Sequence, residues 1–402
     1  MADEQLKRRL GGGLLTLYGL GTTIGAGIYV LVGEVAGIAG YFAPLSFIIA
    51  AVLAGFSALS FAELAVRYPV SAGEAAYVTA GLKKPSIGLI VGLMVVAAGS
   101  VSSAAIVNGF VGYLDVFVDM PRSISIVLVL ALLVALACWG ILESVSFASL
   151  ITAVEIGGLL LIIWVGGSSF SENLPALMDQ LPTFSPGVLS ATLLGATLAF
   201  YAFIGFEDMI NVAEEVKDVP HTMPRAIILT LVVTTVLYVL VSLVAMTALP
   251  LEELASRQAP LARIYEQSTG NAPYVISIIG ILAVLNGALI QIIMASRILY
   301  GLARQEHLPK QLAAVHPRLG TPVLATIATG LFVLVMALLL PLLLLAQFTS
   351  AITLSIFALV NISLILIKRR SHDRPAFQVP AWVPWFGAIC STIFAIIQIG
   401  GF

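Results

Sequence analysis

Charged side chains are scarce in this chain of 402 residues. Asp, Glu, Lys and Arg together make up only 10% of it, against about 25% in an ordinary soluble domain. Hydrophobic residues account for 60%, and the mean hydropathy is +1.07. This composition excludes a water-soluble enzyme, and a net charge of −2 gives no support to binding of nucleic acid.

Residues for metal binding and catalysis are scarce as well. Cys138 and Cys390 both lie in apolar segments and are too few for a disulfide framework or a metal cluster. None of the four histidines falls in an apolar segment. The chain also has no HExxH motif, no Gly-x-Ser-x-Gly motif and no Walker phosphate loop. We therefore expect neither an enzyme nor a primary pump, and no metal or cofactor.

Long uncharged stretches recur along the whole sequence, many of them reaching the ~20 residues that cross a bilayer as a helix. Charged residues and prolines divide them into eleven candidate spans, with Pro341 separating two spans in a long uncharged run. The spans lie near 14–38, 43–65, 86–114, 123–142, 146–168, 187–213, 225–249, 272–303, 322–341, 343–367 and 383–402. The sequence predicts an all-α polytopic membrane protein that forms a single transmembrane domain over 1–402.

The basic residues orient these spans. If successive loops lie on alternate sides, all but three of the 19 Lys and Arg residues fall on one side; the exceptions are Arg122, Arg257 and Arg263. Such a bias marks the cytoplasmic side. We expect a multi-pass protein of the cytoplasmic membrane, with the lipid bilayer as a partner and the N-terminus in the cytoplasm.

Two apolar spans are interrupted by glycine. Four glycines fall within residues 19–27 of span 1, and Gly205 lies in the segment 200–208 of span 6. The two segments are five spans apart and therefore cross the membrane in opposite directions, as the halves of an inverted repeat do. We predict broken helices in spans 1 and 6, a first repeat of about 14–168, a second of about 187–367, and an extra helix at about 383–402.

Broken helices expose main-chain groups that suit a zwitterion. Unwinding around Gly25, Ala26 and Gly27 leaves N–H groups at the positive end of a half-helix, where a carboxylate binds well. Carbonyl groups near residues 23–24 and 202–204 are left to accept hydrogen bonds from an ammonium group. An α-amino acid is the simplest solute that carries both groups.

Five carboxylates fall at membrane depth, where an unpaired charge costs roughly 2.5–3.5 kcal/mol on insertion scales. They are Glu34, Glu63, Glu155, Glu207 and Asp208. Glu63 precedes Arg67 by four residues, a spacing that favours a structural ion pair. Glu207 begins the second half of span 6, so it either caps that half-helix or takes part in gating and ion coupling.

Glu155 stands apart because its span contains no Lys or Arg. One interpretation is that its carboxyl group carries a proton, or receives another cation, during transport. The alternative is a protonated, purely structural side chain that is hydrogen-bonded to a neighbouring helix.

Four segments resemble the amino acid–polyamine–organocation superfamily, and most of all its bacterial permeases that are similar to cationic amino acid transporters. They read GLGTTIGAGIYVLVGEVA at 19–36, FAELAVRYPVSAGEAAY at 61–77, FIGFE at 203–207 and ASRILYGLAR at 295–304. The resemblance covers essentially the whole chain. It implies a LeuT-type fold of two inverted five-helix repeats plus an eleventh helix, with alternating access to a site at the membrane midplane.

The resemblance also assigns site residues. Residues expected to bind substrate are Thr23, Ile24, Gly25, Ala26, Gly27, Ser103, Tyr201, Phe203, Ile204, Gly205 and Gln291. The residues from Ile24 to Gly27 hold the carboxylate, those from Phe203 to Gly205 line the amino end, and Tyr201 takes the place of an aromatic gate. Ser103 and Gln291 come from counting helix register. Several proton-coupled relatives carry a lysine where this chain has Glu155.

The function implied is a secondary active transporter that moves an amino acid. Proton-coupled symport is the first interpretation, and exchange of amino acids or polyamines is the second, because the two would leave very similar sequences. The substrate stays open between cationic amino acids, which the resemblance favours, and small or apolar ones, which suit Ala26, Phe203 and Ile204 at least as well.

Overall fold

The structure is a computed structural model that describes residues 10–400, apart from 71–72, 141–144, 168–169, 171–174, 176–177, 180, 184, 257 and 372. Arg257, one of the three basic residues assigned to the outer side, is outside the described residues. The helices are α1 (Gly12–Ala39), η1 (Gly40–Phe42), α2 (Ala43–Arg67), α3 (Gly73–Leu82), α4 (Pro85–Leu114), α5 (Arg122–Trp139), α6 (Val145–Gly167), α8 (Pro186–Tyr201), η2 (Phe206–Glu215), α9 (Val219–Ala248), α10 (Leu251–Ser256), α11 (Pro260–Thr269), α12 (Tyr274–Arg304), η3 (Lys310–Ala313), α13 (Val323–Leu339), α14 (Leu342–Arg370) and α15 (Trp382–Gly400).

Nine segments of the described chain are long and apolar enough to cross a membrane, and one of them, Gly27–Arg67, joins the second half of α1 to α2. When α1 and α2 are counted separately and the shorter apolar helix α13 is added, the eleven predicted spans are all present as helices. Pro341 separates α13 from α14, as the sequence indicates, because it lacks an N–H and fits the start of a helix. The protein is a multi-pass membrane protein.

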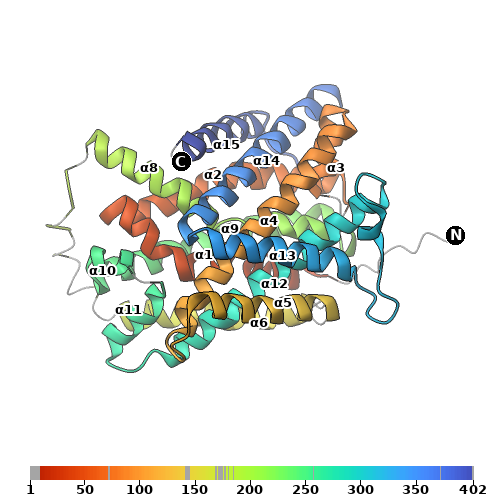
Figure 1. Ribbon diagram of the computed structural model, residues 1–402. Helices are drawn as coiled ribbons and strands as arrows, with labels where there is room; N and C mark the ends of the chain where they lie inside the picture. The colour runs from red at the N-terminus through yellow and green to blue at the C-terminus, as the bar shows by residue number, and fades with distance from the viewer. Residues whose placement is uncertain are drawn as a thin grey trace.

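The long helices lie alongside one another, and the short ones lie at the two ends of the molecule (Figure 1). Helix α3 is at one end of the molecule, while α10 and α11 are at the opposite end (Figure 1). Helix α1 lies inside the bundle, where it packs against α9, α8, α6 and α12. Helix α4 packs against α12 and α14, which brings the first and second halves of the chain together around α1.

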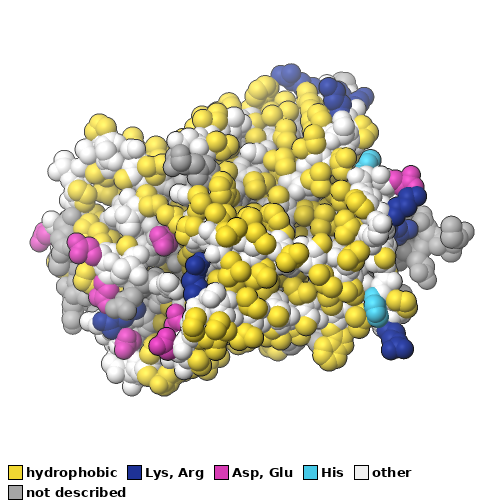
Figure 2. Space-filling model, in the orientation of Figure 1, with side chains coloured by type: hydrophobic (Ala, Val, Ile, Leu, Met, Phe, Trp, Pro, Cys, Tyr) yellow, Lys and Arg dark blue, Asp and Glu magenta, His cyan; other side chains and the backbone are white. Residues whose placement is uncertain are grey.

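The outer surface between the two ends is mainly apolar in the view of Figure 2. In this view, Lys and Arg gather mostly at the end that carries α3, and Asp and Glu gather mostly at the end that carries α10 and α11 (Figure 2). A broad apolar band with charged ends is the surface that a bilayer requires of a spanning protein.

Glu63 of α2 is fully buried but carries a complete set of partners. Its Oε1 accepts hydrogen bonds from Arg67, at 2.9 Å from Nε and 2.8 Å from Nη2. Its Oε2 lies 2.7 Å from Nζ of Lys368 on α14 and accepts a 2.8 Å bond from the N–H of Val379. The expected pair with Arg67 is therefore confirmed, and the same carboxylate also ties α2 to α14 and to the segment before α15.

We predict that Glu63→Gln lowers the thermal stability of the purified protein strongly, because it leaves Arg67 and Lys368 without their anion. Removing one partner of a buried pair costs about 3–5 kcal/mol. Glu253→Gln is the matched control, since Glu253 pairs with Arg263 where both side chains are about 28–29% exposed, and such pairs contribute about 0–1 kcal/mol. Equal shifts in melting temperature for the two variants would contradict this account.

Candidate substrate site between two broken helices

Helix α1 is broken at Gly25, where the sequence predicts the interruption. Gly25 has φ 21° and ψ −135° inside an otherwise helical segment. Its left-handed φ is one that glycine adopts without the clash of a Cβ atom. The break frees main-chain groups of neighbouring residues from helical hydrogen bonding, and it occurs in the middle of the bundle.

The second break separates α8 from η2. Helix α8 ends at Tyr201, and Gly205, with φ 123° and ψ −21°, precedes the helical turns of η2. The N–H of Gly205 donates a 2.8 Å hydrogen bond to Oε2 of Glu207. Of the two interpretations of Glu207, the structure thus contains the cap; a role in ion coupling stays a prediction.

The two breaks touch each other through main-chain atoms. The hydroxyl of Thr22 donates a 2.8 Å hydrogen bond to the carbonyl oxygen of Gly205. A Cβ atom on Gly205 would collide with the carbonyl oxygen of Thr22, and one on Gly27 would lie 2.7 Å from Cα of Ala202. Glycine at positions 27 and 205 therefore allows the two unwound segments to lie directly against each other.

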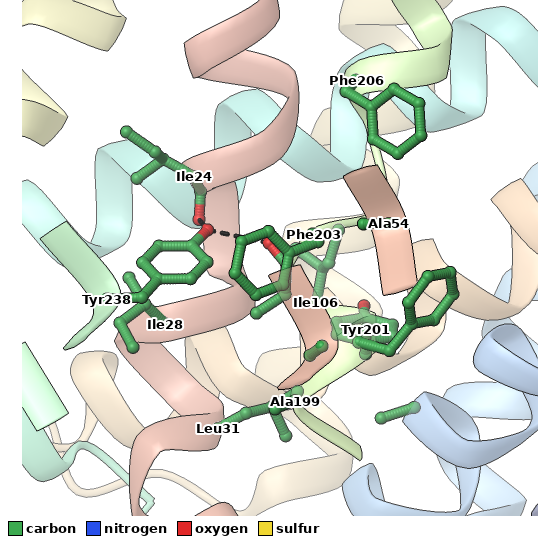
Figure 3. Close-up of a cluster of buried hydrophobic side chains, with 14 of the residues drawn as sticks. Ile24, Ile28, Leu31, Ala54, Ile106, Ala199, Tyr201, Phe203, Phe206 and Tyr238 are labelled. Atoms are coloured by element: carbon green, nitrogen blue, oxygen red, sulfur yellow. Dashed lines mark hydrogen bonds between the residues drawn. The ribbon is translucent and has the colours of Figure 1, made fainter. Parts of the chain in front are cut away.

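Tyr238 of α9 joins the two breaks by a bond that the sequence analysis did not predict. Its hydroxyl donates toward the carbonyl oxygens of Thr23 at 2.9 Å and Ala202 at 2.8 Å, with that of Ile24 at 3.4 Å. Figure 3 shows this hydroxyl between the broken segments, with the ring of Phe203 beside it. The signal in the sequence is a tyrosine in the middle of an apolar span, since a buried phenol needs a hydrogen-bond partner.

A phenol has one proton, so Tyr238 satisfies these carbonyl groups only partly. These carbonyl oxygens can therefore accept further hydrogen bonds, and they are the ones expected from the sequence to bind an ammonium group. The N–H groups that begin the second half of α1 lie across the break and suit an anion. The arrangement can bind a small zwitterion through the main chain.

A small cavity lies between the breaks and the helices α4 and α12. Its volume is about 20 Å³, compared with the roughly 10–15 Å³ that one water molecule requires, so the site is closed around a very small space. The lining residues are Thr22, Thr23, Gly25, Gly27, Ser102, Ile106, Tyr201, Ile204, Gly287, Ile290 and Gln291. Six of these belong to the predicted set: Thr23, Gly25, Gly27, Tyr201, Ile204 and Gln291.

The other predicted residues lie next to this cavity or away from it. Ile24 and Phe203 are fully buried and lie in the two broken segments. Gly205 lies in the second broken segment, where its carbonyl oxygen accepts the hydrogen bond from Thr22. The side chain of Ala26 lies outside the described residues. Ser103 donates hydrogen bonds to the carbonyls of Gly99 at 2.9 Å and Ala288 at 3.4 Å and does not line the cavity.

Ser103 therefore stays a prediction for substrate binding, and the serine at this cavity is its neighbour in α4. Ser102 lines the cavity instead, and its hydroxyl lies 3.0 Å from that of Tyr201. One residue corresponds to a rotation of about 100° around a helix, and counting helix register along the sequence is not accurate enough to separate two adjacent serines in α4.

A second cavity adjoins the first and shares Ser102, Ile204 and Gln291 with it. Its lining includes the carboxyl groups of Glu74, Glu207 and Asp208. Glu74 was missed because the sequence places it in a loop between spans. The structure instead places it in the short helix α3, where its side chain is only 5% exposed.

Glu155 of α6 is fully buried and only partly hydrogen-bonded. Its Oε1 accepts a 3.2 Å bond from Nδ2 of Asn286 on α12, while its Oε2 has no partner among the described residues. The Oδ1 atom of Asn286 likewise has none there. The backbone carbonyl of Glu155 accepts a 2.6 Å hydrogen bond from the hydroxyl of Tyr29, which fixes α6 against the second half of α1. No described Lys or Arg pairs with Glu155.

Comparison with known proteins identifies the family. The family described as "Amino acid permease" matches residues 13–401. The chain belongs to this family. A search of solved structures found a Na⁺-coupled sialic acid symporter in a substrate-bound outward-open state, which aligns with a TM-score of 0.64 at 13% identity over 100% of this chain and 92% of that one. The permease thus has the expected LeuT-type fold, with its inverted repeats, two broken helices and an eleventh helix.

Relatives of the permease differ in their described substrates. The branched-chain amino acid permease BcaP of Bacillus subtilis is 31% identical over 99% of this chain and 89% of its own. The vacuolar cationic amino acid transporter 4 of Arabidopsis thaliana is 32% identical over 91% of this chain, which spans 64% of that longer protein. The methylthioribose transporter of Bacillus subtilis is 27% identical over 94% of this chain and 85% of its own.

We predict that Gly205→Ala reduces the uptake of amino acid into proteoliposomes at least tenfold. The backbone conformation of Gly205 strains any residue with a Cβ atom, by about 1–3 kcal/mol, and the added atom displaces Thr22 from the site. Gly157→Ala is the matched control, because Gly157 is exposed in α6 and nothing lies within 4 Å of the added atom. Wild-type uptake by Gly205→Ala would show that the contact between the breaks is dispensable.

Proposed function

We propose that this permease is a secondary active transporter that moves an amino acid across the cytoplasmic membrane by alternating access. The observation that carries the proposal is the pair of helix breaks that meet at one cavity and present main-chain donors and acceptors to it. Main-chain groups recognise the ammonium and carboxylate groups common to all α-amino acids. The family and its relatives support the same class of substrate.

The orientation is also part of the proposal. Lys and Arg gather mostly at the end that carries α3 (Figure 2), and a basic excess marks the cytoplasmic side. The N-terminus and α3 then lie in the cytoplasm, and α10 and α11 lie outside. The repeat boundaries stay as proposed, with the first five spans within about 14–168 and the second five within about 187–367.

For coupling, we propose that Glu155 carries a proton during the transport cycle. Its carboxyl group is fully buried and accepts one hydrogen bond, from the neutral amide of Asn286. Neither its Oε2 atom nor Oδ1 of Asn286 has a donor among the described residues. A proton on this carboxyl group would remove an uncompensated charge from the membrane interior. Because Tyr29 ties the backbone of Glu155 to α1, its protonation state is well placed to affect the broken helix.

We predict that Glu155→Gln lowers amino acid uptake in proteoliposomes and flattens its pH dependence. Uptake by the wild type should rise as the outside becomes more acidic, because proton entry drives it, and a side chain that cannot titrate should lose this response. Glu34→Gln, at the other end of the second half of α1, should keep it. Unchanged pH-dependent uptake in Glu155→Gln would refute the coupling role, and uptake that requires amino acid inside the vesicles would favour the alternative, a substrate-exchange antiporter.

We also predict that zwitterionic amino acids raise the melting temperature of the purified permease. A ligand that binds only the folded state stabilises it by mass action, by about 2.7 kcal/mol at a concentration of 100 times Kd. The screen should cover the twenty amino acids and several polyamines, with the carboxyl-amidated form of each active amino acid as its control. Stabilisation by non-zwitterionic solutes alone would contradict a site built from both helix breaks.

A further inference from the structure

The second cavity extends the candidate site toward the end of the molecule that carries α3 (Figure 1). It borders the first cavity, because Ser102, Ile204 and Gln291 line both. A substrate whose α-amino and α-carboxyl groups lie at the helix breaks would therefore direct its side chain past Ile204 into this space. The residues of the second cavity would then decide which side chains are accepted.

The polar lining of this cavity is acidic. Glu207 and Asp208 of η2 and Glu74 of α3 are all at least nine-tenths buried, and none of them forms an ion pair with a described Lys or Arg. Oδ2 of Asp208 accepts a 3.1 Å hydrogen bond from Nε2 of Gln291 on α12. Glu74 lies outside the membrane-spanning helices, and burial raises the pKa of its carboxyl group to about 7.

A hydroxyl group without a partner also lines this cavity. Thr353 of α14 is only 3% exposed, and its hydroxyl makes no hydrogen bond with the described residues. Other buried threonines, such as Thr349 one turn earlier, bond back to a carbonyl of their own helix. A buried hydroxyl that is left free at a cavity wall can accept a hydrogen bond from a ligand.

The size of the cavity limits the cation that fits. Its volume is about 30 Å³, room for one or two groups of the size of water at roughly 10–15 Å³ each. A primary ammonium group is compact and has three donors that point in different directions, whereas a guanidinium group is a larger planar fork. In addition, no three described His, Cys, Asp or Glu side chains are grouped to hold a metal ion. The space therefore suits an ammonium group.

We propose that the second cavity is a side-chain subsite that binds the terminal ammonium group of a diamino acid, with Asp208, Glu74 and Thr353 as its acceptors. This inference rests on the proposed function, since the helix breaks must hold the α-amino and α-carboxyl groups. It makes ornithine or lysine a better substrate than arginine or a neutral amino acid of the same length. Gln291 positions Asp208 and links the subsite to the first cavity.

The test compares ornithine with norleucine, which replaces the terminal ammonium group by a methyl group of similar size, and with arginine. Binding to the purified full-length permease is measured by isothermal titration, and uptake is measured in proteoliposomes. We expect the wild type to bind ornithine at least tenfold more tightly than either norleucine or arginine. Equal binding of ornithine and norleucine, or a preference for arginine, would overturn the proposal.

Variants then locate the subsite. Asp208→Asn should reduce the ratio of ornithine affinity to norleucine affinity at least tenfold, and Thr353→Val should reduce it severalfold without removing a charge from the fold. Glu34→Gln, whose carboxyl group lies outside both cavities, should leave the ratio unchanged. If Asp208→Asn does not fold, Glu74→Gln takes its place with the same expected direction.

The outcomes separate this inference from the proposed function. If norleucine is transported and ornithine has no advantage, the subsite is refuted while amino acid transport stands. If no amino acid binds or is transported, the proposed function itself fails. A change in pH dependence in Asp208→Asn with an unchanged ornithine-to-norleucine ratio would mean that these carboxyl groups exchange protons only, and would also refute the subsite.

Discussion

The direct contact between two unwound main-chain segments is the constraint on which the rest of this structure depends. Backbone groups that leave a helix at membrane depth must find partners inside the protein. Here the carbonyl of Gly205 accepts from Thr22, and the carbonyls of Thr23 and Ala202 share the hydroxyl of Tyr238. Because these partners satisfy the main-chain carbonyl groups only partly, the groups can still form hydrogen bonds with a solute. For the same reason, the surrounding helices must be close enough to exclude lipid and bulk water from the breaks.

Buried carboxylates in this protein divide by the number of donors that reach them. Glu63 receives donors from Arg67, Lys368 and a backbone N–H, so its charge is compensated and its role is to tie helices together. Among the described residues, Glu155 receives a single amide donor. The same residue type thus serves packing in one place and is the proposed proton carrier in the other, and the difference lies in its neighbours.

The sequence alone predicted the spans, both helix breaks and the pair formed by Glu63 and Arg67, because glycine conformation and i,i+4 spacing act over short distances along the chain. It did not predict Tyr238 at the breaks, Lys368 at Glu63 or Glu74 beside Asp208, because each joins elements that are distant in sequence. Helix register counted along the sequence indicates Ser103, whereas Ser102 lines the first cavity, for a related reason. Helix register relative to a site depends on packing, which no local pattern determines to within one residue.

The contrast between features set by residues close in sequence and contacts between residues distant in sequence also bears on substrate specificity. In the proposed binding mode, the groups common to all amino acids are bound by backbone whose shape glycines determine, and such glycines are visible in the sequence. The second cavity, where we propose that the substrate side chain binds, is lined by residues from α3, α4, α12, α14 and η2. These lie on separate segments and can change independently of the breaks. A fold that binds the α-amino and α-carboxyl groups of its substrate through the main chain can accept different substrate side chains after few substitutions. This is consistent with relatives that are named as permeases of branched-chain and of cationic amino acids. The substrate of this chain must therefore be inferred from its own second cavity.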